Sequence, residues 1–303
     1  MHLRHWLLLI VAALGWGLGG VITRAAFDQG VDPVEFSAYR SAGAVIAMLA
    51  YVSARHTPPG GRSAWRAGLV LGTVNLAAPF LLLTLAVVYA SAGFVGLLIA
   101  NLPIATALWA HTLGDERLDA RKLLGLSVSL AGVLLLLASG DSGLAKGGNP
   151  SLAIGLSIAG LTMASFGVLY AKRILADFDP ARLALSQFTV GAALLIVLVP
   201  FTDGVPAEIT PWGWVLVATA GVLSTALPFV VFYKAMEYVT ATQAALTGYM
   251  IPIVAVVLGV ILLDERVTST MLAGGALIIG GVILTDRAAA KGPSASVPAR
   301  PRE

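Results

Sequence analysis

The sequence contains no cysteine, which excludes disulfides, thiolate metal sites and cysteine nucleophiles. Charged residues are scarce as well: they make up 12% of the 303 residues, whereas a soluble domain carries roughly 25%. Only four histidines occur, HExxH and GxSxG motifs are absent, and no pair of carboxylates lies inside an apolar run. We therefore expect no enzymatic activity, no metal ion and no cofactor.

Hydrophobic residues make up 58% of the chain and come in long blocks. A helix needs about 20 apolar residues to cross the hydrocarbon core of a bilayer. The predicted fold is therefore an all-α integral membrane protein with ten transmembrane helices. We interpret the first apolar run as a span that is retained, because it continues past Ala13 to Ile22 without a clear signal-peptide cleavage site. The predicted spans are 6–24, 34–52, 65–87, 91–113, 121–138, 151–171, 182–200, 211–233, 241–263 and 270–286.

Lysine and arginine predict the orientation, because positively charged loops tend to stay in the cytoplasm. Most of them fall on the side of the N-terminus, whereas the opposite loops hold only Lys146 and Arg266. Both termini are thus predicted to be cytoplasmic, in the cytoplasmic membrane of a prokaryote. Residues 287–303, rich in Pro, Ala, Ser and Arg, are expected to form a disordered cytoplasmic tail.

The two halves of the chain match each other when one is shifted by 149 positions, without a gap from Trp65 to Leu135. Because each half holds an odd number of helices, the second half must enter the membrane in the opposite direction. We predict two inverted five-helix repeats, 6–138 and 151–286. This plan recurs in secondary transporters, with the site near the midplane between the halves. The matched segments include Pro79-Phe80 with Pro228-Phe229, Pro103-Ile104 with Pro252-Ile253, and Asp115-Glu116-Arg117 with Asp264-Glu265-Arg266.

The sequence resembles the drug/metabolite transporter superfamily, in its EamA-type ten-helix branch. The likeness lies in Trp16-Gly17, in Pro33 with Arg40, and in two long signatures, 92–133 and 237–266. It implies a basket-shaped cavity lined by helices one, three, four, six, eight and nine. Helices five and ten are implied to be peripheral and associated in some members with dimerisation. Members that resemble this chain export amino acids, amine-like compounds and other metabolites, and some take solutes up.

Polar and aromatic residues inside the spans are the candidates for substrate binding. In the fourth span Asn101, Ala105 and Trp109 share one helical face, and His111 lies about one turn from the cytoplasmic end. Such a stripe suits stacking of an apolar solute and orientation of its polar group, although packing between helices uses the same residues. The other candidates are Trp16, Asn75, Phe166, Tyr170, Ser224, Gln243 and Tyr249.

Four prolines are candidates for kinks with a gating role, because proline frees a carbonyl in the preceding turn. They are Pro79, Pro103, Pro228 and Pro252. A charge inside a span is costly and suggests a function. Arg40 is the clearest such charge, and we expect it either to pair with a carboxylate, Glu35 being the nearest in sequence, or to attract an anion. The two Asp-Glu-Arg turns are expected to cap the next helix or to form a loop salt bridge.

Together these patterns predict a secondary transporter that moves a small organic solute, most simply an exporter of an amino acid or similar amphiphilic metabolite that works by alternating access. Multidrug efflux and metabolite uptake are the transport alternatives. A membrane receptor or structural protein is the other alternative, although the loops are short. The expected partners are the small-molecule substrate and the lipid bilayer, with no nucleic acid and with a homodimer left open. No Asp or Glu lies near the middle of a span, so proton coupling is left open too.

Overall fold

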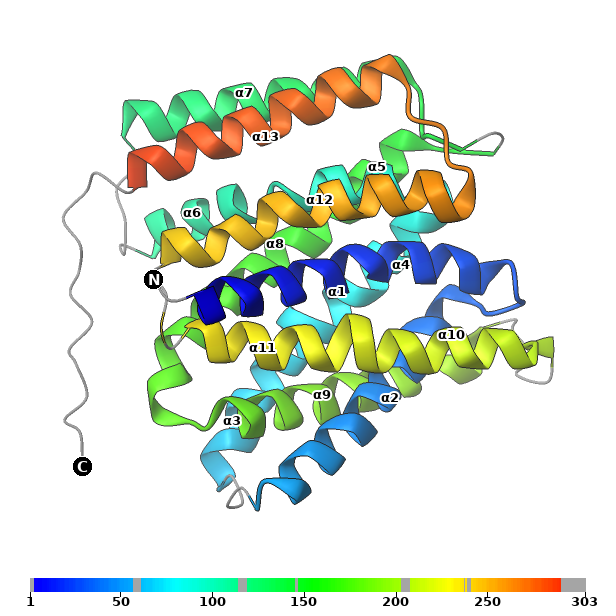
Figure 1. Ribbon diagram of the computed structural model, residues 1–303, viewed down its shortest axis with the longest axis vertical. Coiled ribbons are helices and arrows are strands. Elements are labelled where there is room, and N and C mark those ends of the chain that lie inside the picture. Colours follow the sequence, from blue (N-terminus) through cyan, green and yellow to red (C-terminus); the bar gives the residue numbers. More distant parts are fainter. Residues whose placement is uncertain are drawn as a thin grey trace.

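A computed structural model describes residues 3–56, 61–113, 119–144, 147–202, 208–236, 238 and 241–289. Over these residues the fold contains helices and no strand (Figure 1). The first half comprises α1 (Leu3–Phe27), α2 (Pro33–Ala54), α3 (Arg62–Leu71), the π-helix η1 (Gly72–Ala77), α4 (Ala78–Tyr89), α5 (Ala92–Ile99), α6 (Leu102–Thr112) and α7 (Ala120–Ser139).

The second half has a similar order of elements. It comprises α8 (Pro150–Ile174), the 3-10 turn η2 (Leu175–Asp177), α9 (Pro180–Ile196), the 3-10 turn η3 (Val199–Phe201), α10 (Pro211–Gly221), the π-helix η5 (Val222–Ala226), α11 (Leu227–Met236), α12 (Ala241–Leu263) and α13 (Ser269–Ala289). Within the described residues, seven continuous helical segments are long and apolar enough to cross a membrane, and Met250–Leu263 and Ser269–Leu284 are shorter apolar helices. An all-helical membrane architecture is therefore confirmed, while the count of ten spans stays a prediction.

Several helices begin where the sequence places a polar cap before a proline. The caps are Asp32, Asn149, Asp179 and Thr210, and each side chain accepts a hydrogen bond from a backbone nitrogen in the first helical turn. Proline suits that turn because its missing N–H would have no partner there in any case. These caps and prolines fix the residues at which α2, α8, α9 and α10 begin.

The helices form one bundle in which α1 begins and α13 ends at the same end (Figure 1). Helices α7 and α13 pack against each other along one edge of the bundle. A Cβ added to Gly132 would lie 2.6 Å from the carbonyl oxygen of Gly274, and one added to Gly281 would lie 2.4 Å from that of Gly125. Glycine at these positions lets the two backbones approach closely.

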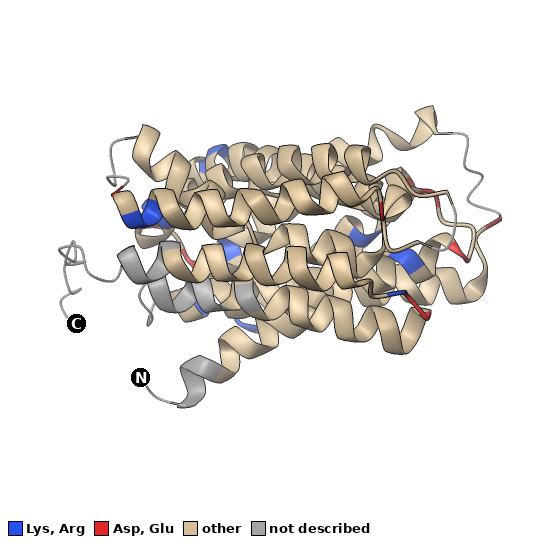
Figure 2. Ribbon diagram, turned by 90° about the horizontal axis from the view of Figure 1, so that it is seen from above, with Lys and Arg blue, Asp and Glu red and all other residues tan. Residues whose placement is uncertain are grey.

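Charge gathers at the two ends of the bundle, and the ribbons between them carry few charged residues (Figure 2). The end where the chain begins carries most of the described basic residues, and the opposite end carries mostly acidic ones. This separation agrees with the orientation predicted from the loops, which remains a prediction. At the first end lie Arg55, Arg62, Arg66, Arg121, Lys122, Lys172, Arg173, Arg182 and Lys234, with the acidic Asp119, Asp177 and Asp179; at the opposite end lie Asp28, Asp32, Glu35, Asp141, Glu208, Asp264 and Glu265, with the basic Arg24 and Arg266.

Candidate functional site

Two π-helical turns interrupt the helices that carry Pro79 and Pro228. In η1 and η5 the backbone nitrogens of Ala78 and Leu227 bond to the carbonyls of Thr73 and Val222, five residues earlier. Each proline lacks an N–H and cannot bond the carbonyl four residues before it, so the widened turn re-pairs the backbone. A π-turn thus lies directly before each of these two prolines, while their role as kinks in gating stays a prediction.

The π-turns carry the two polar candidates Asn75 and Ser224, both buried. The Asn75 amide lies 3.5 Å from the Tyr233 hydroxyl, which donates to the side-chain oxygen of Gln187 at 3.0 Å. The Ser224 hydroxyl bonds within its own helix, to the Ala220 carbonyl. Asn75 thus belongs to a buried polar chain that joins η1, α9 and α11, as expected of a packing role.

Aromatic rings from four helices meet between α1 and α11. Phe229 contacts Phe188, Tyr233 and Phe80 with ring centroids 5.3, 5.9 and 6.3 Å apart. Trp16 packs edge-on against Phe229 and Phe232 at 5.4 and 5.1 Å. We call Trp16, Phe80, Phe188, Phe229, Phe232 and Tyr233 the central aromatic cluster. Trp16, Phe80 and Phe232 remain only partly buried, so the cluster retains accessible ring surface.

A second aromatic pair lies between α6 and α8. The Trp109 ring meets Phe166 at 5.3 Å, and the Trp109 indole nitrogen donates to the Thr162 carbonyl at 2.9 Å. The structure therefore brings two predicted candidates together. Tyr170, one turn beyond Phe166, packs instead at the margin of the core that contains Phe229. Trp16 and Phe166, which occupy matching positions because Trp16-Gly17 aligns with Phe166-Gly167, pack against different rings.

The predicted stripe of Asn101, Ala105 and Trp109 does not lie on one continuous helix. The fourth span is broken at Ala100–Asn101, and α6 starts only at Leu102. Asn101 donates to the Leu98 carbonyl and accepts a hydrogen bond from Ser129 on α7, whereas Trp109 faces α8. Pro103 has no N–H to continue the preceding turn, which explains a break here. Pro252, its counterpart in the repeat, lies inside the unbroken α12.

Arg40 is buried, with 8% of its surface accessible. Its guanidinium carbon lies 4.0 Å from the centroid of the Phe80 ring and 5.7 Å from that of Phe36, and within the described part of the chain its Nε has no hydrogen-bond partner. Glu35 turns back toward its helix start, where Oε2 accepts from the Asp32 backbone nitrogen at 3.4 Å. The predicted pair between Arg40 and Glu35 is therefore not formed.

Glu265, in the second Asp-Glu-Arg turn, caps a helix of the other half. Its carboxylate accepts hydrogen bonds from the backbone nitrogens of Ala92 at 2.6 Å and Gly93 at 3.0 Å, at the start of α5. The expectation of a cap on the next helix is thus wrong in its partner, because α13 is capped by Thr268. The equivalent turn at 115–117 lies outside the described residues.

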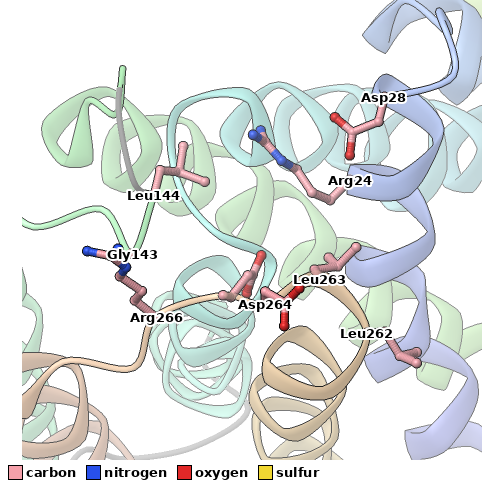
Figure 3. Close-up of a pocket in the computed structure, with 9 residues that line it drawn as sticks. Arg24, Asp28, Gly143, Leu144, Leu262, Leu263, Asp264 and Arg266 are labelled. Atoms are coloured by element: carbon pink, nitrogen blue, oxygen red, sulfur yellow. The ribbon is translucent and has the colours of Figure 1, made fainter.

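A pocket of about 400 Å³ lies beside this turn (Figure 3). Figure 3 shows Arg24 on α1 and Asp28 just after α1 on one side of the pocket, and Asp264 and Arg266 from the segment that follows α12 on the other. Arg24 also donates to the Val87 carbonyl at 3.3 Å. Both signs of charge line this pocket, which lies at the acidic end of the bundle, away from the aromatic rings.

The remaining candidates for substrate binding are His111, Gln243 and Tyr249. His111 is exposed on α6. Gln243 and Tyr249 lie on α12, but their side chains are outside the described residues, as is the 290–303 part of the predicted tail. Among the described residues no group of three His, Asp or Glu could hold a metal ion.

Sequence reasoning missed Gln187, Tyr233 and Phe229. A signal for Gln187 was present: Asp32-Pro33 matches Asp179-Pro180, and eight residues after each aspartate stand Arg40 and Gln187. Phe229 was matched to Phe80 in the repeat without being named as a candidate. For Tyr233 we find no signal, because its counterpart in the repeat is Thr84.

Comparison with known proteins extends these observations. The model of the EamA-like transporter family matches residues 4–138 and 151–286. The uncharacterized protein PA1977 of Pseudomonas aeruginosa is 29% identical over 284 residues, which cover 93% of this chain and 94% of that protein. A probable terminal-alkyne amino-acid exporter of Streptantibioticus cattleyicolor is 24% identical over 216 residues, 71% of each chain. One crystal structure is similar with a TM-score of 0.67 at 20% identity, covering 96% of this chain and 99% of that one, which shows the fold alone.

Proposed function

The chain belongs to the EamA-like transporter family, and from this premise we propose that it exports an amino acid or a similar small amphiphilic metabolite by alternating access. The family places it among membrane transporters, not among enzymes. The bilayer and a small-molecule solute are accordingly its partners. The proposal concerns what the family alone leaves open: the class of solute, the direction of transport and the site.

We further propose that the chain crosses the cytoplasmic membrane of a prokaryote ten times, as two inverted five-helix halves. The contacts of Gly132 with Gly274 and of Gly125 with Gly281 support this arrangement, because the partners exchange places when one half is mapped onto the other. The π-turns η1 and η5 occupy matching positions of the two halves and support it too. A homodimer remains a prediction.

The observation that carries the proposed site is a set of partly buried aromatic rings contributed by several helices. Trp16 and Phe80 of the central aromatic cluster, and Trp109 and Phe166 of the second aromatic pair, come from α1, α4, α6 and α8 and are only partly buried. Rings offer apolar solutes a large contact area at low entropic cost. Such a surface suits the apolar part of an amphiphile, and alternating movement of the two halves would expose it to each side in turn.

The support for an amino acid as solute is the relative from Streptantibioticus cattleyicolor, whose name describes a probable exporter of terminal-alkyne amino acids. Such a compound joins a short apolar chain to a zwitterionic head. A site built from aromatic rings around a sparse set of polar groups is compatible with this chemistry.

The test is flux in proteoliposomes loaded with a panel of labelled amino acids, including 2-amino-4-pentynoate as a terminal-alkyne probe. Wild type is compared with Trp109→Ala and, as a matched control, with Trp65→Ala. Trp65 is exposed on α3 and belongs to neither of the two aromatic groups of the site. We expect release of one class of amino acid, its loss in Trp109→Ala and its retention in Trp65→Ala.

Two outcomes would contradict the proposal in different ways. If solute moves and Trp109→Ala transports as well as wild type while remaining folded, the assigned site is wrong and the transport reading survives. If no amino acid moves but a broad panel of cationic drugs does, multidrug efflux replaces amino-acid export.

A further inference from the structure

Over the residues that the structure describes, the helices packed against α2 carry no carboxylate that could neutralise Arg40. Helix α2 packs mainly against α9, α10, η5 and α4. Over their described residues these elements contain no Asp or Glu, and their only charged residue is Arg182. Glu35, on α2 itself, is directed to the Asp32 backbone. In the part of the chain that the structure describes, Arg40 is therefore a buried cation without an anion.

The contacts that Arg40 does make compensate poorly for its burial. Removing a charge from water is costly unless the charge is paired and hydrogen-bonded. The Phe80 ring, 4.0 Å from the guanidinium carbon, supplies a cation–π contact, which stabilises a cation less than an ion pair with full hydrogen bonding does. The Nε–H has no hydrogen-bond partner among the described residues. The guanidinium therefore retains unused capacity to donate hydrogen bonds.

The architecture of the bundle does not itself require a cation here. Gln187 occupies the matching position on α9, the helix that packs against α2. Its side-chain oxygen accepts from Tyr233 at 3.0 Å, so a neutral amide fits this position within a packed core. Packing of α2 against α9 therefore does not by itself explain why position 40 holds an arginine.

Arg40 also lies at the edge of an aromatic surface. The Phe80 ring lies under the guanidinium, and its centroid is 6.3 Å from that of Phe229. The Phe229 centroid is in turn 5.4 Å from that of Trp16. A path of rings therefore leads from the cation to α1. A solute with a carboxylate at one end and an apolar group at the other could pair its carboxylate with Arg40 and place its apolar group against the rings.

We propose that Arg40 binds the carboxylate of the transported solute, while the apolar part of the solute lies against Phe80 and Trp16. Resting on the export function proposed above, this inference narrows the solute to apolar carboxylates, zwitterionic amino acids included. The planar guanidinium can donate two parallel hydrogen bonds to one carboxylate. Amines and neutral drugs that lack an acidic group are disfavoured.

The test measures binding and flux separately. Binding is measured by thermal stabilisation of the detergent-solubilised protein by apolar amino acids and aryl- or alkyl-carboxylic acids, each beside its primary amide. We expect wild type to bind at least one carboxylate about tenfold more tightly than its amide, because a charge-assisted bidentate hydrogen bond is lost in the amide. In Arg40→Gln, which copies the matching residue, that preference should vanish; in Arg40→Lys it should fall, because the charge is kept without the planar fork.

Arg55→Gln is the matched control. Arg55 directly follows the last residue of α2, and its guanidinium carbon lies 5.6 Å from the centroid of the Tyr51 ring, but its side chain is exposed. This variant should keep the preference for carboxylates.

The outcomes separate this inference from the proposed function. Binding of a carboxylate that depends on Arg40, without flux in proteoliposomes, supports the site and overturns the export proposal. Flux with no preference for carboxylate over amide, or with a preference that Arg40→Gln retains, overturns the inference and leaves transport standing. If no carboxylate on the panel is bound better than its amide, the inference is overturned as well. Should Arg40→Gln fail to fold, the comparison of carboxylate with amide binding in Arg40→Lys tests the inference in its place.

Discussion

The Glu265 carboxylate accepts a hydrogen bond from the backbone nitrogen of Ala92 at 2.6 Å, across 173 positions of the chain. Gly93 donates to the same carboxylate, so two backbone N–H groups at the start of α5 are satisfied by one side chain. The first N–H groups of a helix have no partner within the helix, and the helix dipole favours a negative charge there. Glu265 thus fastens the second half of the chain to the first.

The first prediction follows from this cap. Glu265→Ala should lower the free energy of unfolding by about 1–3 kcal/mol, because two backbone donors lose a charged acceptor. Thermal unfolding in detergent measures this as a lower midpoint. Glu208→Ala, at an exposed position on the same end of the bundle, serves as control and should leave the midpoint unchanged. Equal midpoints for both variants would show that the cap contributes nothing.

This cap illustrates what the sequence could and could not predict. Repetition of the Asp-Glu-Arg turn identified Glu265 as a residue with a structural task. Its partner could not be read from the sequence, because local rules place a cap on the nearest helix and this one acts on α5. Helix positions were more predictable, since hydrophobic length, polar caps and prolines are all local signals. For Asn101 the local rule failed: an i, i+4, i+8 stripe assumes a continuous helix, and the chain breaks at Ala100–Asn101.

The second prediction separates the hydrogen bond that the Trp109 indole donates from the ring surface that it offers. Trp109→Phe removes the hydrogen bond to the Thr162 carbonyl but keeps a ring that can pack on Phe166. If the ring surface is what binds solute, Trp109→Phe should retain most of the flux, whereas Trp109→Ala should lose it. The stability cost of Trp109→Phe should be only about 0.5–1.5 kcal/mol, the net contribution of one hydrogen bond. Equal loss of flux in both variants would instead assign the role to the indole N–H.

The third prediction concerns the buried polar chain through Tyr233. The Tyr233 hydroxyl donates to Gln187 and lies within reach of Asn75. Tyr233→Phe would leave the side-chain oxygen of Gln187 without its donor, in addition to the Gln187 nitrogen that already lacks a partner. We expect a loss of about 1–3 kcal/mol of stability, the cost of a buried unsatisfied group.

The control for this variant is Tyr51→Phe, whose hydroxyl accepts from the exposed Arg55 at 3.0 Å. It should change the unfolding midpoint little, because water replaces that partner. A double variant, Tyr233→Phe with Gln187→Leu, should recover part of the lost stability, since removing both partners leaves fewer unsatisfied groups. A double variant less stable than Tyr233→Phe alone would indicate that Gln187 has another essential contact.

The fourth prediction concerns Arg40 in the protein without solute. Arg40 has no ion pair among the described residues, so Arg40→Met removes a burial cost without breaking a bond. Replacing a buried charge by an apolar side chain of similar volume is often neutral or stabilising. We expect the thermal midpoint of the solute-free protein to stay equal or rise while carboxylate binding is lost. A large fall in the midpoint would instead show that the cation has a structural partner.

The last prediction compares two adjacent glycines on α13. A Cβ at Gly281 would lie 2.4 Å from the Gly125 carbonyl oxygen and 2.5 Å from the Ser129 backbone nitrogen, whereas nothing lies within 4 Å of a Cβ at Gly280. Backbone atoms cannot rotate away, so Gly281→Ala must push α7 and α13 apart, at a cost of about 1–3 kcal/mol. Gly280→Ala should instead stabilise the helix by about 0.5–1 kcal/mol, because alanine loses less backbone entropy. Thermal unfolding of the two variants beside wild type should therefore move the midpoint in opposite directions. Midpoints that move together would mean that α7 and α13 are not packed as closely as described, and would remove one support for the inverted halves.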